Sequence, residues 1–214
     1  MNWQGQEFTR SSYLENSLLT GPHVQVLDDL IPESLKTRLI EAMSWMPVHF
    51  LNRAERYNSH ELDMHWYYPI AFSENADTGD VEPALLALDE TLQSVTQCWS
   101  LIKASYSHPV RLYECMLSAN TFGTEGRLHH DIPYPEARSR HHTVLVYCNA
   151  KWDAAWAGET LVFDEHNEIT AAVIPKPGRV MKIAGDPAHV GRSVSKTCPT
   201  DRRVLVFKLW EVKR

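Results

Sequence analysis

The stretch HTVLVYCNAKWDAAWAGETLVFD, residues 142–164, decides the fold, because it holds two runs of β-branched and aromatic residues around a turn. The runs at 142–148 and 159–164 predict strands, and the separating Asn149-Ala150-Lys151 supplies turn residues. Working outward, the same pattern predicts further strands near residues 109–119, 126–130, 168–174, 179–184, 189–195 and 203–212. No helical pattern separates these strands, which argues against a parallel β/α fold and favours a β-sandwich or barrel.

The first half of the chain predicts helices that pack outside this β structure. Residues 33–45 and 82–101 carry apolar residues at steps of three and four, so each is expected to form one amphipathic helix. The alternating HVQVL at 23–27 predicts a short strand. Residues 1–22 are polar and irregular, and the aromatic-rich residues 46–80 favour no single assignment.

Composition narrows the functional classes. The 214 residues are 43% hydrophobic and 22% charged, which is typical of one globular domain. A formal charge of −6 argues against a broad basic face for duplex nucleic acid. The apolar runs are too short to span a bilayer, and MNWQGQEFTR does not resemble a signal peptide, so a cytoplasmic location is expected. The four cysteines form no C-x-x-C pair, which argues against a zinc ribbon or a thioredoxin-like site.

The segment GRLHHD, residues 126–131, carries the most specific chemistry. In a strand, residues i and i+2 point to the same side, so His129 and Asp131 can meet at one metal ion. His189 is the best third ligand, because it opens a predicted strand after the Gly185-Asp186-Pro187 turn, 189 − 131 = 58 residues further on. Two histidines and one carboxylate leave positions open for non-haem iron(II) oxygen chemistry. An isolated H-x-D is a weak signal, and its surroundings must support it.

Those surroundings resemble the Fe(II)- and 2-oxoglutarate-dependent dioxygenases, particularly the prolyl-4-hydroxylase-like group. Four ordered segments between residues 119 and 210 carry the resemblance: ANTFGTEGRLHHD, TVLVYCNAKWDAAWAGETLVF, PKPGRVMKIAGDPAHVGRSVS and RRVLVFKLW. Upstream, HVQVLDDLIPESL resembles the strand and helix start that often precede this core. The resemblance implies a mainly β fold with a double-stranded β-helix (jelly-roll) core and N-terminal flanking helices. We therefore expect a single domain, with the strand and supporting helices in residues 1–108 and the catalytic core in residues 109–214.

The resemblance also implies a function. Fe(II) would be held by His129, Asp131 and His189, with 2-oxoglutarate as cosubstrate and O2 as oxidant. The expected reaction is hydroxylation of an unactivated C–H bond in a small molecule or a peptide or protein side chain, with release of succinate and CO2. Halogenases of this superfamily replace the carboxylate with Ala or Gly, so the presence of Asp131 favours hydroxylation. Demethylation and desaturation would use the same iron site.

The far carboxylate of 2-oxoglutarate needs a buried cation, for which Arg202 and Arg203 are the two candidates. The two side chains alternate along the last strand and so face opposite ways. Hydrophobic pattern favours Arg203, because that choice keeps Lys208 out of the core, whereas family spacing slightly favours Arg202. By resemblance, Tyr147 is expected to touch the cosubstrate carboxylate and Thr160 to line the same pocket.

Two other classes of function remain open. A cupin-type metalloenzyme would share the jelly-roll but not the dependence on 2-oxoglutarate, although GRLHHD matches the usual cupin pattern poorly. A binding module without turnover is the third reading. The substrate and the oligomeric state are not readable, but residues 46–80 and 132–141 are expected to border the iron. His130 is expected to point away from the metal, and His141 and His142 to be solvated or hydrogen-bonded at a strand edge.

Overall fold

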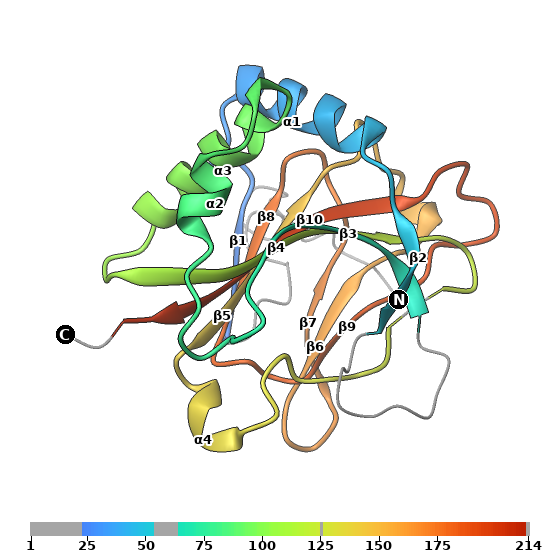
Figure 1. Ribbon diagram of the computed structural model, residues 1–214. Helices are drawn as coiled ribbons and strands as arrows, with labels where there is room; N and C mark the ends of the chain where they lie inside the picture. Colours follow the sequence, from blue (N-terminus) through green and yellow to red (C-terminus); the bar gives the residue numbers. More distant parts are fainter. Residues whose placement is uncertain (1–22, 54–63, 125, 213–214) are drawn as a thin grey trace, which may run out of the picture.

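The computed structural model describes residues 23–53, 64–124 and 126–212 (Figure 1). The expectation of an irregular segment over residues 1–22 falls outside these residues. The elements in chain order are β1 (Val24–Leu27), α1 (Glu33–Trp45), β2 (His49–Arg53), β3 (Met64–Phe72), α2 (Glu82–Leu86), η1 (Glu90–Leu92), α3 (Gln93–Ala104), β4 (Val110–Asn120), α4 (Pro135–Arg138), β5 (His141–Tyr147), η2 (Ala154–Trp156), β6 (Thr160–Phe163), β7 (Ile169–Val173), β8 (Val180–Ala184), β9 (His189–Gly191) and β10 (Arg202–Glu211).

Two antiparallel sheets form a jelly-roll. The larger sheet has seven strands in the order β1-β8-β5-β10-β4-β3-β2, and the smaller has three in the order β7-β6-β9. Apolar side chains from both sheets fill the space between them, namely Val24, Met116, Leu145, Tyr147, Val162, Ala171, Val173, Met181, Ile183, Val204 and Val206. The expected mainly β fold with a jelly-roll core is therefore confirmed.

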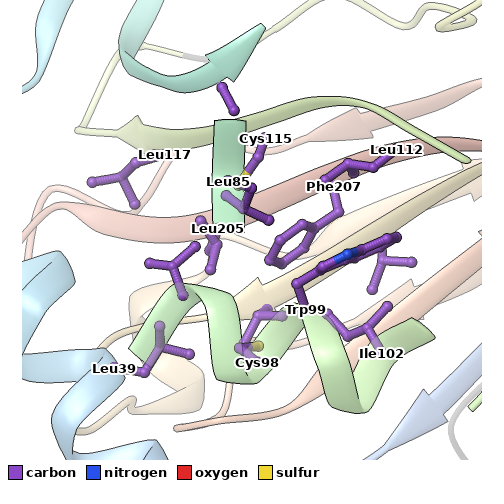
Figure 2. Close-up of a cluster of buried hydrophobic side chains, with 14 of the residues drawn as sticks. Leu39, Leu85, Cys98, Trp99, Ile102, Leu112, Cys115, Leu117, Leu205 and Phe207 are labelled. Carbon is purple, nitrogen blue, oxygen red and sulfur yellow. The ribbon is translucent and has the colours of Figure 1, made fainter. Parts of the chain in front are cut away.

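The helices cover the outer face of the large sheet, as Figure 1 shows for α1, α2 and α3. Their apolar stripes pack on outward-facing residues of β4, β5 and β10 and form a core that is larger than the one between the sheets (Figure 2). At its centre the Trp99 ring stacks on the Phe207 ring, with 5.7 Å between ring centroids. Because this core fixes the outer face of β10, the alternate residues of that strand must point into the space between the sheets.

The single helix predicted over residues 82–101 is wrong. The chain instead forms α2, a 3-10 turn and then α3, which ends at Ala104. The break lies at Asp89, whose backbone is extended and whose Oδ1 accepts a hydrogen bond from Thr91 N at 2.9 Å. A short acidic side chain in this position starts a new helical turn instead of continuing the old one, so the local cap outweighs the apolar periodicity.

Two strand predictions also need correction. Residues 126–130 form no strand, because only His129 pairs, through an isolated bridge to His189. The strand expected over residues 189–195 is limited to β9. The unassigned residues 46–80 contain β2 and β3, which extend one edge of the large sheet. In the described part of the chain, no helix has both the length and the apolar character needed to cross a bilayer.

Candidate metal centre and anion pocket

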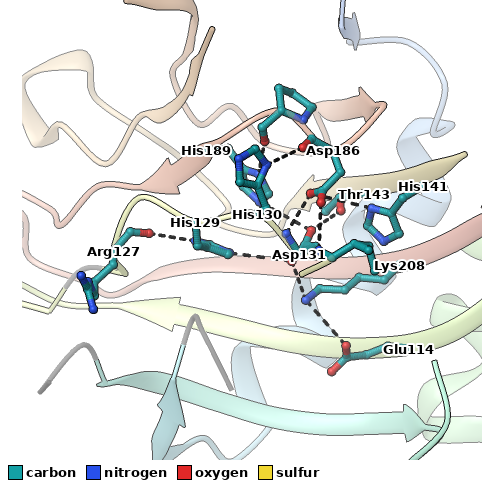
Figure 3. A network of polar contacts seen from close by, with 12 residues as sticks. Glu114, Arg127, His129, His130, Asp131, His141, Thr143, Asp186, His189 and Lys208 are labelled. Atoms are coloured by element: carbon teal, nitrogen blue, oxygen red, sulfur yellow. Dashed lines mark hydrogen bonds and ion pairs between the residues drawn. The ribbon is translucent and has the colours of Figure 1, made fainter. Parts of the chain in front are cut away.

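Three potential metal ligands converge between the two sheets, in the network drawn in Figure 3. His129 and Asp131 lie in the segment that follows β4, and His189 opens β9. His129 Nε2 lies 3.7 Å from Asp131 Oδ1, and His189 Nε2 lies 3.6 Å from Asp131 Oδ2. Two backbone hydrogen bonds, His129 N to His189 O and His189 N to His129 O, hold the two segments together at 3.1 and 2.9 Å.

The backbone selects the tautomer of both imidazoles. His129 Nδ1 lies 2.8 Å from Arg127 O, and His189 Nδ1 lies 2.9 Å from Pro187 O. A carbonyl oxygen can only accept, so each Nδ1 carries the proton and donates it. The Nε2 atoms are therefore left with the lone pairs that a metal ion requires. This arrangement is therefore better explained as a site for a divalent cation than as a purely structural cluster of ion pairs.

The charge states of His189 and Asp131 suit a metal site. Burial lowers the pKa of His189 to about 4, so its imidazole is neutral near pH 7. Burial lowers the pKa of His129 as well, but the Asp131 carboxylate outweighs burial and raises that pKa above its usual value. Burial raises the pKa of Asp131, yet Lys208 and the two histidines hold it well below the usual range for a carboxyl group. Asp131 is therefore an anion in the folded protein.

Asp131 is oriented by a second buried carboxylate. Asp186 accepts hydrogen bonds from Asp131 N and Ile132 N, each at 2.8 Å, and Thr143 Oγ1 donates to Asp131 Oδ2. Burial, followed by repulsion from Asp131, raises the pKa of Asp186 to about 7. The predicted Gly185-Asp186-Pro187 turn contains this residue, but its supporting role was not recognised from the sequence. The available signal in the sequence was an acidic residue, Asp186, three positions before the proposed ligand His189.

A cavity of about 540 Å³ opens onto these ligands, a size typical of small-molecule sites. Its wall includes His129, Asp131, His189, Thr160, Arg202 and Lys208. Residues 72–77 and 132–134 also line it. The cavity is thus bordered by parts of both segments, 46–80 and 132–141, that were expected to lie near the iron.

Arg202 occupies the wall of this cavity as a buried cation with neutral partners. Its side chain donates to Gly158 O at 2.6 Å, to Thr160 Oγ1 at 2.7 Å and to Asn120 Oδ1 at 3.2 Å. The guanidinium carbon also lies 5.3 Å from the centroid of the Tyr147 ring. Arg202 is only 3% exposed, and among the described residues no carboxylate forms an ion pair with it. Buried charges are normally paired, so this arrangement suits an anionic ligand.

Tyr147 and Thr160 lie next to Arg202 in different ways. The Tyr147 hydroxyl donates to Thr160 Oγ1 at 2.8 Å, and Tyr147 is fully buried behind the cavity wall that Thr160 lines. Thr160 Oγ1 therefore accepts from both Tyr147 and Arg202, which uses its two lone pairs. Its own O–H is left to donate toward an acceptor in the cavity. Tyr147 supports this hydroxyl and does not itself line the cavity.

Arg203 faces the other side of the sheet. Its guanidinium donates to Asp201 Oδ2 and to the carbonyl oxygens of Met43 and Met46, at the end of α1. The pattern argument that favoured Arg203, by keeping Lys208 outside, is wrong. Lys208 points into the cavity, where Asp131 and Glu114 lie within 4 Å of its ammonium (Figure 3).

The neighbouring histidines take structural positions. His130 points away from the three ligands, and its Nδ1 lies 2.7 Å from Asp186 O. His141 opens β5 and is fully buried, and its Nε2 lies 2.8 Å from the Tyr113 hydroxyl, so of the two expected states, solvated or hydrogen-bonded, it takes the second. His142 is also buried, and it pairs with Glu211 on the opposite face of the sheet.

Comparison with solved structures identifies the fold. A prolyl hydroxylase from Trichoplax adhaerens, in complex with a hypoxia inducible factor oxygen degradation domain peptide fragment, matches with a TM-score of 0.62, 16% identity and coverage of 88% of this chain and 84% of that chain. An oxidoreductase of the 2OG-Fe(II) oxygenase family from Burkholderia pseudomallei gives a TM-score of 0.58 and 13% identity, covering 88% and 85%. A Pseudomonas putida prolyl-4-hydroxylase gives 0.54 and 16%, covering 90% and 95%.

The likeness lies in the structure and not in the sequence. The sequence matches no protein-family model and no curated protein. Similarity at these identities establishes the fold, and activity must be argued from the site. The matches cover 88–90% of this chain and 84–95% of the compared chains, so they concern most of the fold. This chain therefore has the fold of the prolyl hydroxylases and the 2OG-Fe(II) oxygenases.

Proposed function

We propose that this chain is an Fe(II)- and 2-oxoglutarate-dependent oxygenase that hydroxylates an unactivated C–H bond of a small molecule or of a peptide or protein side chain. One observation carries the proposal. The same cavity holds a two-histidine, one-carboxylate set and a buried arginine whose partners are neutral. The first feature suits Fe(II) with open coordination positions, and the second suits a dicarboxylate.

His129, Asp131 and His189 would hold the iron, because their donor atoms all lie within 4.8 Å of one another and the backbone carbonyls hold the Nδ1 protons, which leaves Nε2 of each neutral imidazole as the ligand atom. When bound, Fe(II) with 2-oxoglutarate and O2 supplies the oxidant for hydroxylation and releases succinate and CO2. Asp186 positions the Asp131 segment through two backbone N–H groups, which keeps the carboxylate aimed at the two imidazoles.

Arg202 and Thr160 would bind the far carboxylate of the cosubstrate. The guanidinium is always charged and already oriented by three hydrogen bonds, so little side-chain entropy is lost on binding. The Thr160 hydroxyl donates a further hydrogen bond from beside it. Tyr147 is a positioning residue, because it acts through Thr160. Burial of Arg202 excludes water, which strengthens its attraction for an anion.

The substrate would enter between residues 72–77 and 132–134, which line the part of the cavity outside the metal ligands. The Trichoplax enzyme was solved with a peptide fragment, which supports a peptide side chain as one substrate class. The cavity volume of about 540 Å³ also accommodates a free small molecule. The net charge of −6 makes duplex nucleic acid an unsuitable substrate.

An anaerobic titration of the apo protein with Fe(II) and then 2-oxoglutarate tests the proposal without knowledge of the substrate. Chelation of iron by the keto acid gives a weak visible charge-transfer band. We expect this band in the native protein and in the exposed-histidine control His166→Ala, and we expect its loss in His129→Ala and His189→Ala.

The absence of a band in folded, iron-loaded protein would overturn the cosubstrate assignment. The cupin-type alternative, a metalloenzyme independent of 2-oxoglutarate, would then account better for the same three ligands. A positive result leads to a substrate screen in which succinate release is measured.

A further inference from the structure

We propose that His108, His142 and Glu211 form a second metal site, which takes a divalent transition ion such as Zn²⁺ and lies outside the candidate centre. The three donor atoms lie within 4.8 Å of one another. Glu211 Oε1 lies 2.9 Å from His142 Nε2 and 3.2 Å from His108 Nε2. A tetrahedral Zn²⁺ with bonds of about 2.0–2.1 Å separates its ligand atoms by about 3.4 Å, so only small side-chain movements are needed.

The two sites lie on opposite faces of the large sheet. His142 pairs with Leu209 in the β5–β10 register, and Leu209 belongs to the core that the helices cover. Glu211 lies two residues beyond Leu209 and so points to the same face. Thr143 and Lys208, in the alternate positions, point to the cavity and contact Asp131. A metal ion at Glu211 would therefore be independent of the ligands His129, Asp131 and His189.

Three separate segments meet at this point, and the backbone fixes their approach. His142 is the second residue of β5, and Glu211 ends β10. His108 lies between α3 and β4, and the next residue is held to the end of β10 by a hydrogen bond from Val212 N to Pro109 O at 3.0 Å. An ion bound here would clamp the last strand to the start of two others.

A metal ion would replace one proton at this point. The Glu211 carboxylate can only accept, so without a metal His142 donates from Nε2 to it, and on binding the ion takes the place of that proton while Nδ1 keeps the other. His108 Nε2 is shielded from solvent and, within the described residues, has no hydrogen-bond partner, although it lies close to the same carboxylate oxygen.

Access and packing also suit an ion. The side chains of His108 and Glu211 are 36% and 37% exposed, so water can complete the coordination. The Tyr106 ring makes edge-to-face contacts with both imidazoles, at 5.5 Å from His108 and 5.3 Å from His142, and restricts their rotation.

One nearby cation opposes metal binding. Lys182 lies over the Tyr106 ring at 4.1 Å and repels a cation at His142. We therefore expect Lys182→Met to strengthen metal binding.

Zn²⁺ alone, added to the metal-free chain of 214 residues, tests the proposal. The His129→Ala/His189→Ala variant removes the candidate centre, and we expect it to bind one Zn²⁺ per chain in competition with a chromophoric chelator. Adding either His108→Ala or Glu211→Gln should weaken that binding by more than about tenfold, since even changes outside the ligand shell cost about 10–100-fold. His166→Ala is the control, because it removes one exposed histidine elsewhere.

If the double variant does not fold, the same comparison is made in the native sequence. We then expect two Zn²⁺ per chain, falling to one in His108→Ala. A Zn²⁺ stoichiometry that His108→Ala and Glu211→Gln leave unchanged in protein with a native circular dichroism spectrum would overturn the second site. The absence of any Zn²⁺ binding beyond the candidate centre would do so too.

Discussion

The Lys208 ammonium nitrogen lies 2.7 Å from Asp131 Oδ1, so a partly buried cation contacts the carboxylate of the candidate metal centre. Glu114 Oε2 lies 3.7 Å from the same nitrogen on the other side. The lysine therefore balances the negative charge of Asp131 when no metal is bound. It also competes with any metal ion for the same carboxylate oxygen. This relationship links the stability of the apo protein to its metal affinity.

Replacing Lys208 with Met should separate these two effects. The apo protein should lose about 3 kcal/mol, since breaking a buried ion pair leaves an uncompensated charge. Metal binding should become at least about tenfold tighter, because the competing cation is gone. Fe(II) or Co(II) titration and urea unfolding with and without metal measure the two quantities. Lys208→Arg keeps the charge as a control, and metal binding that is unchanged or weaker in the Met variant would contradict the argument.

Arg202 and Arg203 form a matched pair for the cosubstrate. Arg202→Lys should raise the 2-oxoglutarate concentration needed for the charge-transfer band by at least about tenfold, equivalent to about 1.4 kcal/mol, because lysine cannot reproduce bidentate binding. Arg203→Lys should leave that concentration unchanged. It should lower the free energy of unfolding by about 1 kcal/mol, because Arg203 donates hydrogen bonds to Met43 O and Met46 O. The reverse pattern would assign the anion to Arg203.

Thr160→Val should weaken 2-oxoglutarate binding by about tenfold, because it removes both the donor in the cavity and the acceptor for Arg202. Tyr147→Phe should weaken it by less than about threefold, since Tyr147 reaches the cavity through Thr160. The same anaerobic titration measures both variants. A larger loss in Tyr147→Phe than in Thr160→Val would mean that Tyr147 contacts the cosubstrate itself.

The Asp28 carboxylate ties β1 to the segment before β8 through Arg179 and Lys176. The hydrogen bond from Arg179 outweighs burial and lowers the pKa of Asp28 from 3.8 to about 2. A depressed carboxyl pKa stabilises the fold above the unfolded-state value and loses this effect as the pH falls through the folded-state value. Asp28→Asn should therefore cost about 1 kcal/mol at pH 7 and almost nothing near pH 2. Urea unfolding across this range tests the difference, and an equal loss at both pH values would contradict it.

The helix α2 offers a matched pair for the outer core. Leu85 is fully buried in the cluster of Figure 2, whereas the next residue, Leu86, is 54% exposed. Leu85→Ala should lower the free energy of unfolding by about 2–5 kcal/mol, because it leaves a cavity against the sheet. Leu86→Ala should change it by no more than about 0.5 kcal/mol. Thermal or urea unfolding of the two variants should differ clearly, and equal losses would mean that α2 does not pack as described.

The sequence by itself determined the β-rich class and most strand positions. The run of β-branched and aromatic residues in HTVLVYC places β5 to within a residue, and the strands predicted at 159–164, 168–174 and 179–184 match β6, β7 and β8. Such signals are local, because periodicity and turn chemistry involve residues close together in the chain. The same locality explains the error at residues 82–101, where an apolar stripe continued across the break that Asp89 makes.

Only the tertiary structure decided which face of β10 points inward. Alternation allows either Arg202 or Arg203 to face the cavity. The hydrophobic pattern favoured Arg203, and this was wrong, because the pattern assumes that a lysine at position 208 is unfavourable between the sheets. The acids that compensate Lys208 come from other segments, Glu114 from β4 and Asp131 from beyond it. The energy of a buried charge depends on which distant residues surround it. The pattern along a single strand therefore cannot determine whether a charged side chain is buried. Nor can it determine that His108, His142 and Glu211 come together on the outer face.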